Sequence, residues 1–313
     1  MAGGANSLNQ FIRFGTDAYG IERLLRLFQA LTQLLLAYPS LALILLPLPS
    51  SLLSPSPSPS TPKPLDPVIL SAIRNRLATL RRPFRFFRFL DSFTAAWAAW
   101  QTPLSSTSAA AVSSPRPGWL PEQLERYLDA AAKSFTGMYY LLESATFPEA
   151  LDIPGLSVWG EERARLLAVE AQRFWFLGLV CAVLAGGLRA LFLSWALSLS
   201  LAPAAAGERR AEGSGEGEAK GNVPATRGES GGDVHVVVGL REKRRITARR
   251  MVADALDLAV PGSVIGWVPF SSGVVSLLMF WSTILTGLEV WERCGREVAA
   301  EKAAGEEFGG KLR

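Results

Sequence analysis

One stretch of 31 residues without a charged side chain, Leu258–Leu288, constrains this chain more than any other feature. A helix that spans the hydrocarbon core of a bilayer needs about 20 apolar residues. A helix that is apolar on all sides is either deeply buried in a large protein or embedded in a membrane. We therefore predict that the second half of the stretch, from Ser272 to Trp291, spans a membrane. Trp267, Trp281 and Trp291 are candidates for the membrane interface, and Trp281, near the middle of the span, has packing against a neighbouring helix as the alternative.

A second apolar run, Phe174–Ala202, contains one charged residue, Arg189. An arginine at the bilayer centre costs about 3 kcal/mol, so a span that starts at Phe174 and leaves Arg189 near its end is the favoured register. Gly186 and Gly187 allow another helix to approach closely. With helical periodicity elsewhere, the two runs predict an all-α membrane protein with amphipathic N-terminal helices and two membrane-associated helices.

Val68–Leu90 is a basic amphipathic stretch with six arginines and no acidic residue. At helical spacing its apolar and basic residues separate onto adjacent faces, which is typical of a helix lying in a bilayer interface against anionic phospholipids. A packed helix with a solvated basic face is an equally good interpretation; a nucleic-acid site is a weaker one. Pro83 favours two helices meeting at Arg82–Pro83. The candidate membrane-binding residues are Ile73, Leu77, Leu80, Phe84 and Phe87, with Arg74, Arg81, Arg82, Arg85 and Arg88.

Composition divides the chain into eight segments. These are an N-terminal amphipathic helix (6–38), a Pro/Ser-rich linker (39–66), the basic amphipathic region (67–101), a helical region (119–173), the first span (174–202), a low-complexity polar and basic loop (203–250), a C-terminal region with the second span (251–293) and a charged tail (294–313).

Side chains for catalysis are scarce. His235 is the one histidine, and the two cysteines, Cys181 and Cys294, are far apart in the sequence. These residues cannot build a zinc site or a Cys/His catalytic pair, and no Gly-x-Ser-x-Gly motif is present. We therefore expect no catalytic site, no metal and no cofactor.

Four stretches resemble the peroxisomal biogenesis factor 11 (peroxin-11) family. They are Gly20–Gln29 (GIERLLRLFQ), Leu80–Leu90 (LRRPFRFFRFL), Tyr139–Glu143 (YYLLE) and Asp254–Leu278 (DALDLAVPGSVIGWVPFSSGVVSLL). The last is the most specific of the four, and they occur in the family's order. The Pro/Ser insertion, Pro83 and Ser276 depart from the family pattern, which suggests a divergent, fungal-type member.

The resemblance implies a multi-pass peroxisomal membrane protein, with both termini cytosolic, that elongates the membrane and promotes peroxisome proliferation and fission. It implies as partners an anionic phospholipid membrane, further copies of the chain, the fission machinery (a dynamin-related GTPase and its adaptors) and a membrane-protein import receptor, and no nucleic acid. Two other function classes stay open from the residues alone: a pore or metabolite channel, and a purely structural membrane anchor.

Overall fold

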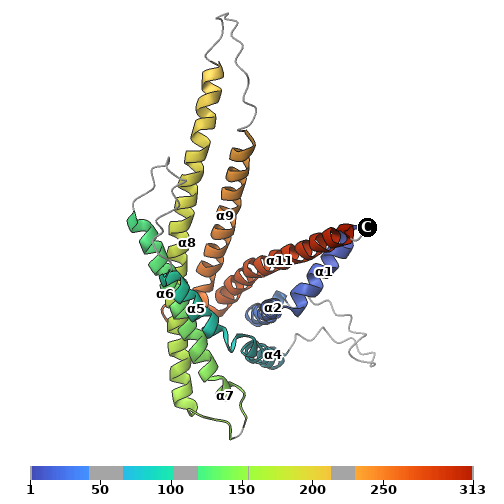
Figure 1. Ribbon diagram of the computed structural model, residues 1–313. Coiled ribbons are helices and arrows are strands. Elements are labelled where there is room, and N and C mark those ends of the chain that lie inside the picture. Colours follow the sequence, from blue (N-terminus) through green and yellow to red (C-terminus); the bar gives the residue numbers. More distant parts are fainter. Residues whose placement is uncertain (1, 42–65, 102–118, 154, 213–229, 312–313) are drawn as a thin grey trace, which may run out of the picture.

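In the computed structural model, residues 2–41, 66–101, 119–153, 155–212 and 230–311 are described, and the regular structure in these ranges is helical throughout (Figure 1). The long elements are α1 (Ala2–Thr16), α2 (Ala18–Ala37), α4 (Pro67–Arg81), α5 (Arg88–Gln101), α6 (Trp119–Ala145), α8 (Glu161–Glu212), α9 (Ser230–Asp257) and α11 (Ser272–Lys311). The short elements are the 3₁₀ turn η2 (Pro83–Arg85), α7 (Phe147–Ala150) and α10 (Ala259–Val264).

Two of these helices are long and apolar enough to cross a bilayer, Glu161–Ser198 within α8 and Ser272–Gly305 within α11. They confirm the predicted class, an all-α membrane protein. Helices α6 and α9 pack against α8, whereas α1 and α2 pack against α11. In Figure 1, α11 runs at a wide angle to α8, so the molecule has two arms that meet near the C-terminal end of α9.

The long apolar stretch is not one helix. It contributes α10, then an irregular turn in which Gly266 has a φ of 78°, and then α11 from Ser272, the predicted start of the second span. Only glycine adopts such a positive φ without strain. Beyond the apolar residues α11 continues to Lys311, because the alanine, glutamate and lysine residues of the tail favour helix.

The N-terminal amphipathic segment is two helices, and the prediction of one continuous helix is wrong. Asp17 ends α1 and caps α2, its carboxylate accepting a hydrogen bond from the Gly20 amide at 3.3 Å. Aspartate is a strong N-cap because its side chain satisfies a free amide of the first turn. A Cβ at Gly20 would lie 1.9 Å from the carbonyl oxygen of Phe14, so this tight junction requires glycine.

Much of the segment predicted as a loop is helical, which corrects the sequence interpretation. Helix α8 continues through Pro203 to Glu212, and α9 starts at Ser230 and carries the basic run into Asp257. Alanine-rich and Arg/Glu-rich sequences have high helix propensity, which extends both helices beyond the expected ends. The Pro/Ser linker and the Ser/Ala/Pro connector before α6 lie almost entirely outside the described residues.

Pro83 divides the basic amphipathic stretch, as the sequence predicts. Asp66 caps α4, its carboxylate accepting from the Val68 amide at 2.9 Å, and α4 ends at Arg81. Pro83 then starts η2, and α5 begins at Arg88. Proline fits the first turn of a helical element, where its missing N–H would be unpaired anyway. The break changes the direction of the chain between the two helices.

Candidate functional site

Glu22 is the centre of a buried group of charges between α2, α4 and α5. Its side chain is 2% exposed, and its carboxylate accepts hydrogen bonds from Arg81 Nη2 at 2.6 Å and Nε at 3.2 Å. Arg23 and Arg88 approach the same carboxylate at 3.6 and 3.8 Å. Arg81 also donates to the side-chain oxygen of Gln29 at 2.7 Å. One acid therefore holds three guanidinium groups from three elements.

A second buried ion pair joins the N-terminal helices to the C-terminal half of the chain. Arg26 Nη2 donates to Asp257 Oδ1 at 2.5 Å, and both side chains are almost inaccessible. The Ser282 hydroxyl donates to the same carboxylate. The Arg26 guanidinium also lies over the ring of Trp175, 5.9 Å from its centroid. These contacts bring residues of α2, α8, α9 and α11 together in one place.

A third ion pair connects η2 to α6. Arg85 donates to the Tyr139 hydroxyl at 2.9 Å and to the Glu143 carboxylate at 2.7 Å. The residue after Glu143, Ser144, donates its hydroxyl hydrogen to the Phe86 carbonyl at 2.7 Å. Tyr139 stacks on Trp175 at a centroid distance of 5.2 Å, which links this pair to Arg26. We refer to these connected residues as the polar network: Glu22, Arg26, Arg81, Arg85, Arg88, Tyr139, Glu143 and Asp257.

Burial and charge act in opposite directions on the pKa values of the polar network. Burial raises the pKa of Glu22, but the positive charges of its neighbouring arginines outweigh this and hold the pKa well below its usual range. Burial, with repulsion from Arg85, lowers the pKa of Arg81 to about 10. Burial raises the pKa of Tyr139 more than the charge of Arg85 lowers it, so its phenol stays protonated. At neutral pH Glu22 and Arg81 are therefore both charged.

The opposite side of the basic amphipathic stretch is apolar and exposed. Its large side chains have exposed fractions of 36% (Phe84) to 68% (Phe87). We refer to this surface as the outward apolar face: Ile69, Ile73, Leu80, Phe84 and Phe87. The residue after Ile69, Leu70, is 7% exposed, so the boundary between the exposed and the buried face of α4 passes between these two residues. The alternative of a solvated basic face on a packed apolar helix does not fit this orientation.

The ten predicted membrane-binding residues fall into two groups. Ile73, Leu80, Phe84 and Phe87 lie on the outward apolar face, and Leu77, Arg74 and Arg82 are partly exposed beside it. Arg81, Arg85 and Arg88 belong to the polar network instead. The contact of these three arginines with anionic lipid stays a prediction, and in this fold it would require their ion pairs to open.

Sequence reasoning from periodicity missed the acidic partners and the aromatic residues of the polar network. Glu22, Tyr139, Glu143 and Asp257 entered only as parts of the four stretches that carry the family resemblance. One signal was available: Glu22 and Arg26 interrupt the apolar pattern of α2 at helical spacing. A charge on an otherwise apolar face predicts a buried partner, but spacing does not identify that partner.

Fold and site together define a class: a helical membrane protein whose separate sequence segments are held by internal ion pairs. The model of one family, peroxisomal biogenesis factor 11 (PEX11), matches residues 59–291, more than half of the 313 residues. The chain belongs to this family. Comparison with curated proteins and with solved structures gave no match.

Family membership makes the chain a peroxisome biogenesis factor of the peroxisomal membrane, in a family of structural and biogenesis proteins rather than enzymes. The matched region contains three of the four stretches that suggested it; Gly20–Gln29 precedes the match. The structure nevertheless places Glu22 and Arg26 from that first stretch in the same network as Arg81, Arg85, Tyr139, Glu143 and Asp257.

Asp254 gives a prediction about pH. Burial raises the pKa of this carboxyl to about 6, the charge of Asp257 adds to the shift, and Arg250 opposes it. The folded state then holds this proton more tightly than the unfolded chain, where the pKa is about 3.9. Its contribution to stability therefore falls as pH rises from about 4 to about 6. Asp254→Asn should raise the free energy of unfolding by about 1–3 kcal/mol at pH 7 and by almost nothing at pH 4.

Thermal unfolding of the two proteins across this pH range checks the prediction. Asp91→Asn, the same change at an exposed residue of α5, serves as the control. If Asp254→Asn raised the stability equally at pH 4 and pH 7, the raised pKa of Asp254 would be contradicted.

Proposed function

We propose that this protein elongates the peroxisomal membrane by inserting the outward apolar face into the cytosolic leaflet, and so promotes peroxisome proliferation and fission. The observation that carries the proposal is the exposure of five large apolar side chains on α4, on η2 and in the turn before α5. An amphipathic helix that lies in one leaflet displaces lipid there and favours curvature. A large exposed apolar surface of this kind marks an interaction site.

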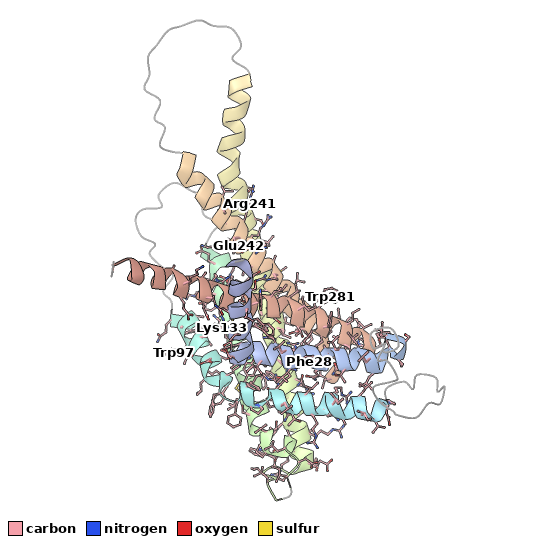
Figure 2. The ribbon with its side chains drawn as sticks, turned by 90° about the vertical axis from the view of Figure 1, so that its right-hand side faces the viewer. Phe28, Trp97, Lys133, Arg241, Glu242 and Trp281 are labelled. Atoms are coloured by element: carbon pink, nitrogen blue, oxygen red, sulfur yellow. The ribbon has the colours of Figure 1, made fainter. Side chains whose placement is uncertain are left out.

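Aromatic residues extend this surface along α5. Trp97 and Trp100 are exposed by 62% and 59%, and Trp97 projects from the bundle in Figure 2. Tryptophan is enriched where membrane proteins meet the boundary between acyl chains and head groups. The outward apolar face and these two indoles would together follow the membrane surface over both helices.

The polar network supports the proposal by fixing the orientation of the helices. Arg81, Arg85 and Arg88 point inward and hold the helix on the body of the protein, so the apolar side is the one left free. The cations available to anionic head groups in this arrangement are Arg74, Arg76 and Arg82. Each could contribute about 1 kcal/mol of attraction to an anionic surface.

The same proposal includes the partners implied by the family. We propose that the chain assembles with further copies and with the fission machinery, a dynamin-related GTPase and its adaptors, after delivery by a membrane-protein import receptor.

Two candidate spans place both ends of the chain on one side of the membrane, and we propose that this side is the cytosol. Protease treatment of intact organelles should degrade tags at both termini; protection of either tag would contradict this topology.

The test uses the full chain reconstituted into vesicles with and without anionic lipid. Tubule length, measured by electron microscopy, should be greater with anionic lipid. Changing Arg74, Arg76 and Arg82 to glutamine should remove about 3 kcal/mol of attraction and with it most of that difference. Arg241→Gln, at an exposed arginine of α9, is the control. Absence of tubules in vesicles of both compositions would contradict the proposal.

A further inference from the structure

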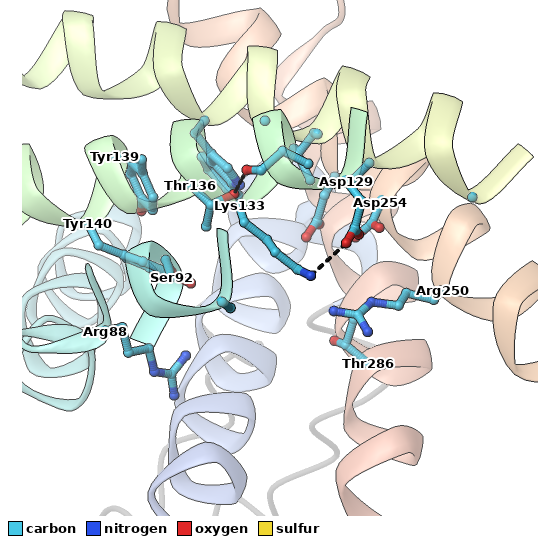
Figure 3. A pocket seen from close by; sticks show the side chains of 18 of the residues that line it. Arg88, Ser92, Asp129, Lys133, Thr136, Tyr139, Tyr140, Arg250, Asp254 and Thr286 are labelled. Carbon is cyan, nitrogen blue, oxygen red and sulfur yellow. Dashed lines mark hydrogen bonds and ion pairs between the residues drawn. The ribbon is translucent and has the colours of Figure 1, made fainter. Parts of the chain in front are cut away.

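A polar cavity of about 700 Å³ lies at the meeting point of α2, α5, α6, α8 and α9 (Figure 3). Among the described residues, eight arginine and lysine side chains line it, against five aspartate and glutamate side chains. Figure 3 shows Lys133 and Arg250 pointing into it from opposite walls, with Arg88 and Ser92 on a third side. The membrane-elongation proposal does not use this cavity.

Several of the cations that line the cavity have an acidic partner of their own. Arg26 pairs with Asp257, Arg85 with Glu143, and Lys133 with Asp129 at 2.6 Å. Arg189, at the edge of the cavity, pairs with Glu125. These pairs are neutral as units and attract no further ion strongly.

The group around Glu22 is not neutral. Arg23, Arg81 and Arg88 carry three positive charges, and Glu22 supplies one negative charge within 4 Å of them. Asp91, one turn beyond Arg88 on α5, also lines the cavity but is itself exposed to solvent. A buried excess of positive charge is costly unless an anion balances it. Asp254, also on the cavity wall near Arg250 and Arg23, offsets part of this excess. A phosphate anion supplies the negative charge that the group still lacks.

Arg88 offers a free hydrogen-bond donor beside this excess. Its side chain is 10% exposed, and its buried Nη2 makes no hydrogen bond to any described residue. The central carbon of its guanidinium lies over the Tyr19 ring, 4.1 Å from the ring centroid. The planar fork of an arginine matches two oxygens of a phosphate.

We propose that this cavity binds a phosphate group, which Arg88 holds directly and to which Arg23 and Arg250 supply further positive charge. The ligand is a phosphate-bearing anion, either a free small molecule or the head group of an anionic phospholipid. Bound there, it ties α2, α5 and α9 together, so occupancy would stabilise the fold.

The test measures thermal unfolding of the full chain in nanodiscs of zwitterionic lipid, with inorganic phosphate or with sodium chloride at equal ionic strength. Phosphate should raise the melting temperature more than chloride. Arg88→Gln should weaken the apparent phosphate affinity about tenfold or more, the loss expected for one charge-assisted hydrogen bond. Arg245→Gln, at an exposed arginine of α9 outside the cavity, should respond like the unmodified protein.

A second arm separates the two sources of phosphate. Nanodiscs that contain phosphatidic acid should raise the melting temperature and abolish the response to added phosphate if a lipid head group fills the cavity. If the ligand is instead a small molecule in solution, nanodiscs that contain phosphatidic acid should leave the response to added phosphate unchanged. Arg250→Gln, at an exposed position on the cavity wall, tests the same site should Arg88→Gln fail to fold. No specific effect of phosphate in either arm, or equal effects in the unmodified and cavity variants, would overturn the proposal.

Discussion

Replacing Glu22 with glutamine should lower the free energy of unfolding by about 3–5 kcal/mol, the usual loss when one partner of a buried ion pair is removed. Arg81 would lose its charged partner, and Arg23 and Arg88 would lose the nearest negative charge. The replacement keeps the size of the side chain, so lost packing contributes little. Denaturant unfolding of the purified protein in nanodiscs measures the change.

Glu242→Gln is the matched control, since Glu242 pairs with Arg245 at the surface of α9. Exposed pairs contribute about 0–1 kcal/mol, so this variant should be almost as stable as the unmodified protein. The lowered pKa of Glu22 also fixes the pH dependence: its stabilisation is present above its ordinary pKa and disappears as pH falls through the lower value of the folded state. Equal stability losses for the two variants would show that the Glu22 cluster does not hold the helices together.

The second large effect concerns the outward apolar face. Leu80→Asp combined with Phe87→Asp should abolish tubule formation while leaving thermal stability almost unchanged. Each apolar side chain contributes about 1.5–3 kcal/mol when fully buried, so the pair supplies several kcal/mol of membrane insertion. Both residues are more than half exposed in the folded chain, 55% for Leu80 and 68% for Phe87, so the fold depends on them little.

Val252→Asp, at a 45% exposed valine on α9, introduces the same charge away from this face. It should form tubules as the unmodified protein does. Tubules of normal length from the Leu80/Phe87 double variant would show that the outward apolar face does not act on the membrane, and the proposed mechanism would be lost with it.

The sequence predicted the features that depend on local chemistry. Helix α11 starts at Ser272 because proline and glycine residues interrupt the apolar stretch before it. The basic stretch breaks at Pro83 because a proline cannot sit inside a straight helix without losing a hydrogen bond. Helical periodicity also grouped Ile73, Leu80, Phe84 and Phe87 on one face.

The features that depend on distant partners could not be predicted from spacing. Arg81 and Glu22 are 59 residues apart, and Arg26 and Asp257 are 231 apart, so no local pattern pairs them. These pairs set the orientation of α4. Three arginines of the basic amphipathic stretch, Arg81, Arg85 and Arg88, form ion pairs with acidic residues in the interior and therefore face inward. Two helix ends also differ from the prediction. Asp17 caps α2 and so divides the N-terminal helix, and high helix propensity carries α8 beyond Pro203.

In the basic amphipathic stretch, Arg81, Arg85 and Arg88 face inward, whereas the outward apolar face is exposed. Adjacent residues test it: Ile69 is 53% exposed and Leu70 is 7% exposed. Single cysteines at the two positions, in a chain with Cys181 and Cys294 changed to serine, can carry a fluorophore in vesicles of brominated lipid. We predict strong quenching by the bromine atoms for the label at position 69 and weak quenching at position 70. Equal quenching at both positions, or the reverse order, would contradict the outward orientation of the apolar face.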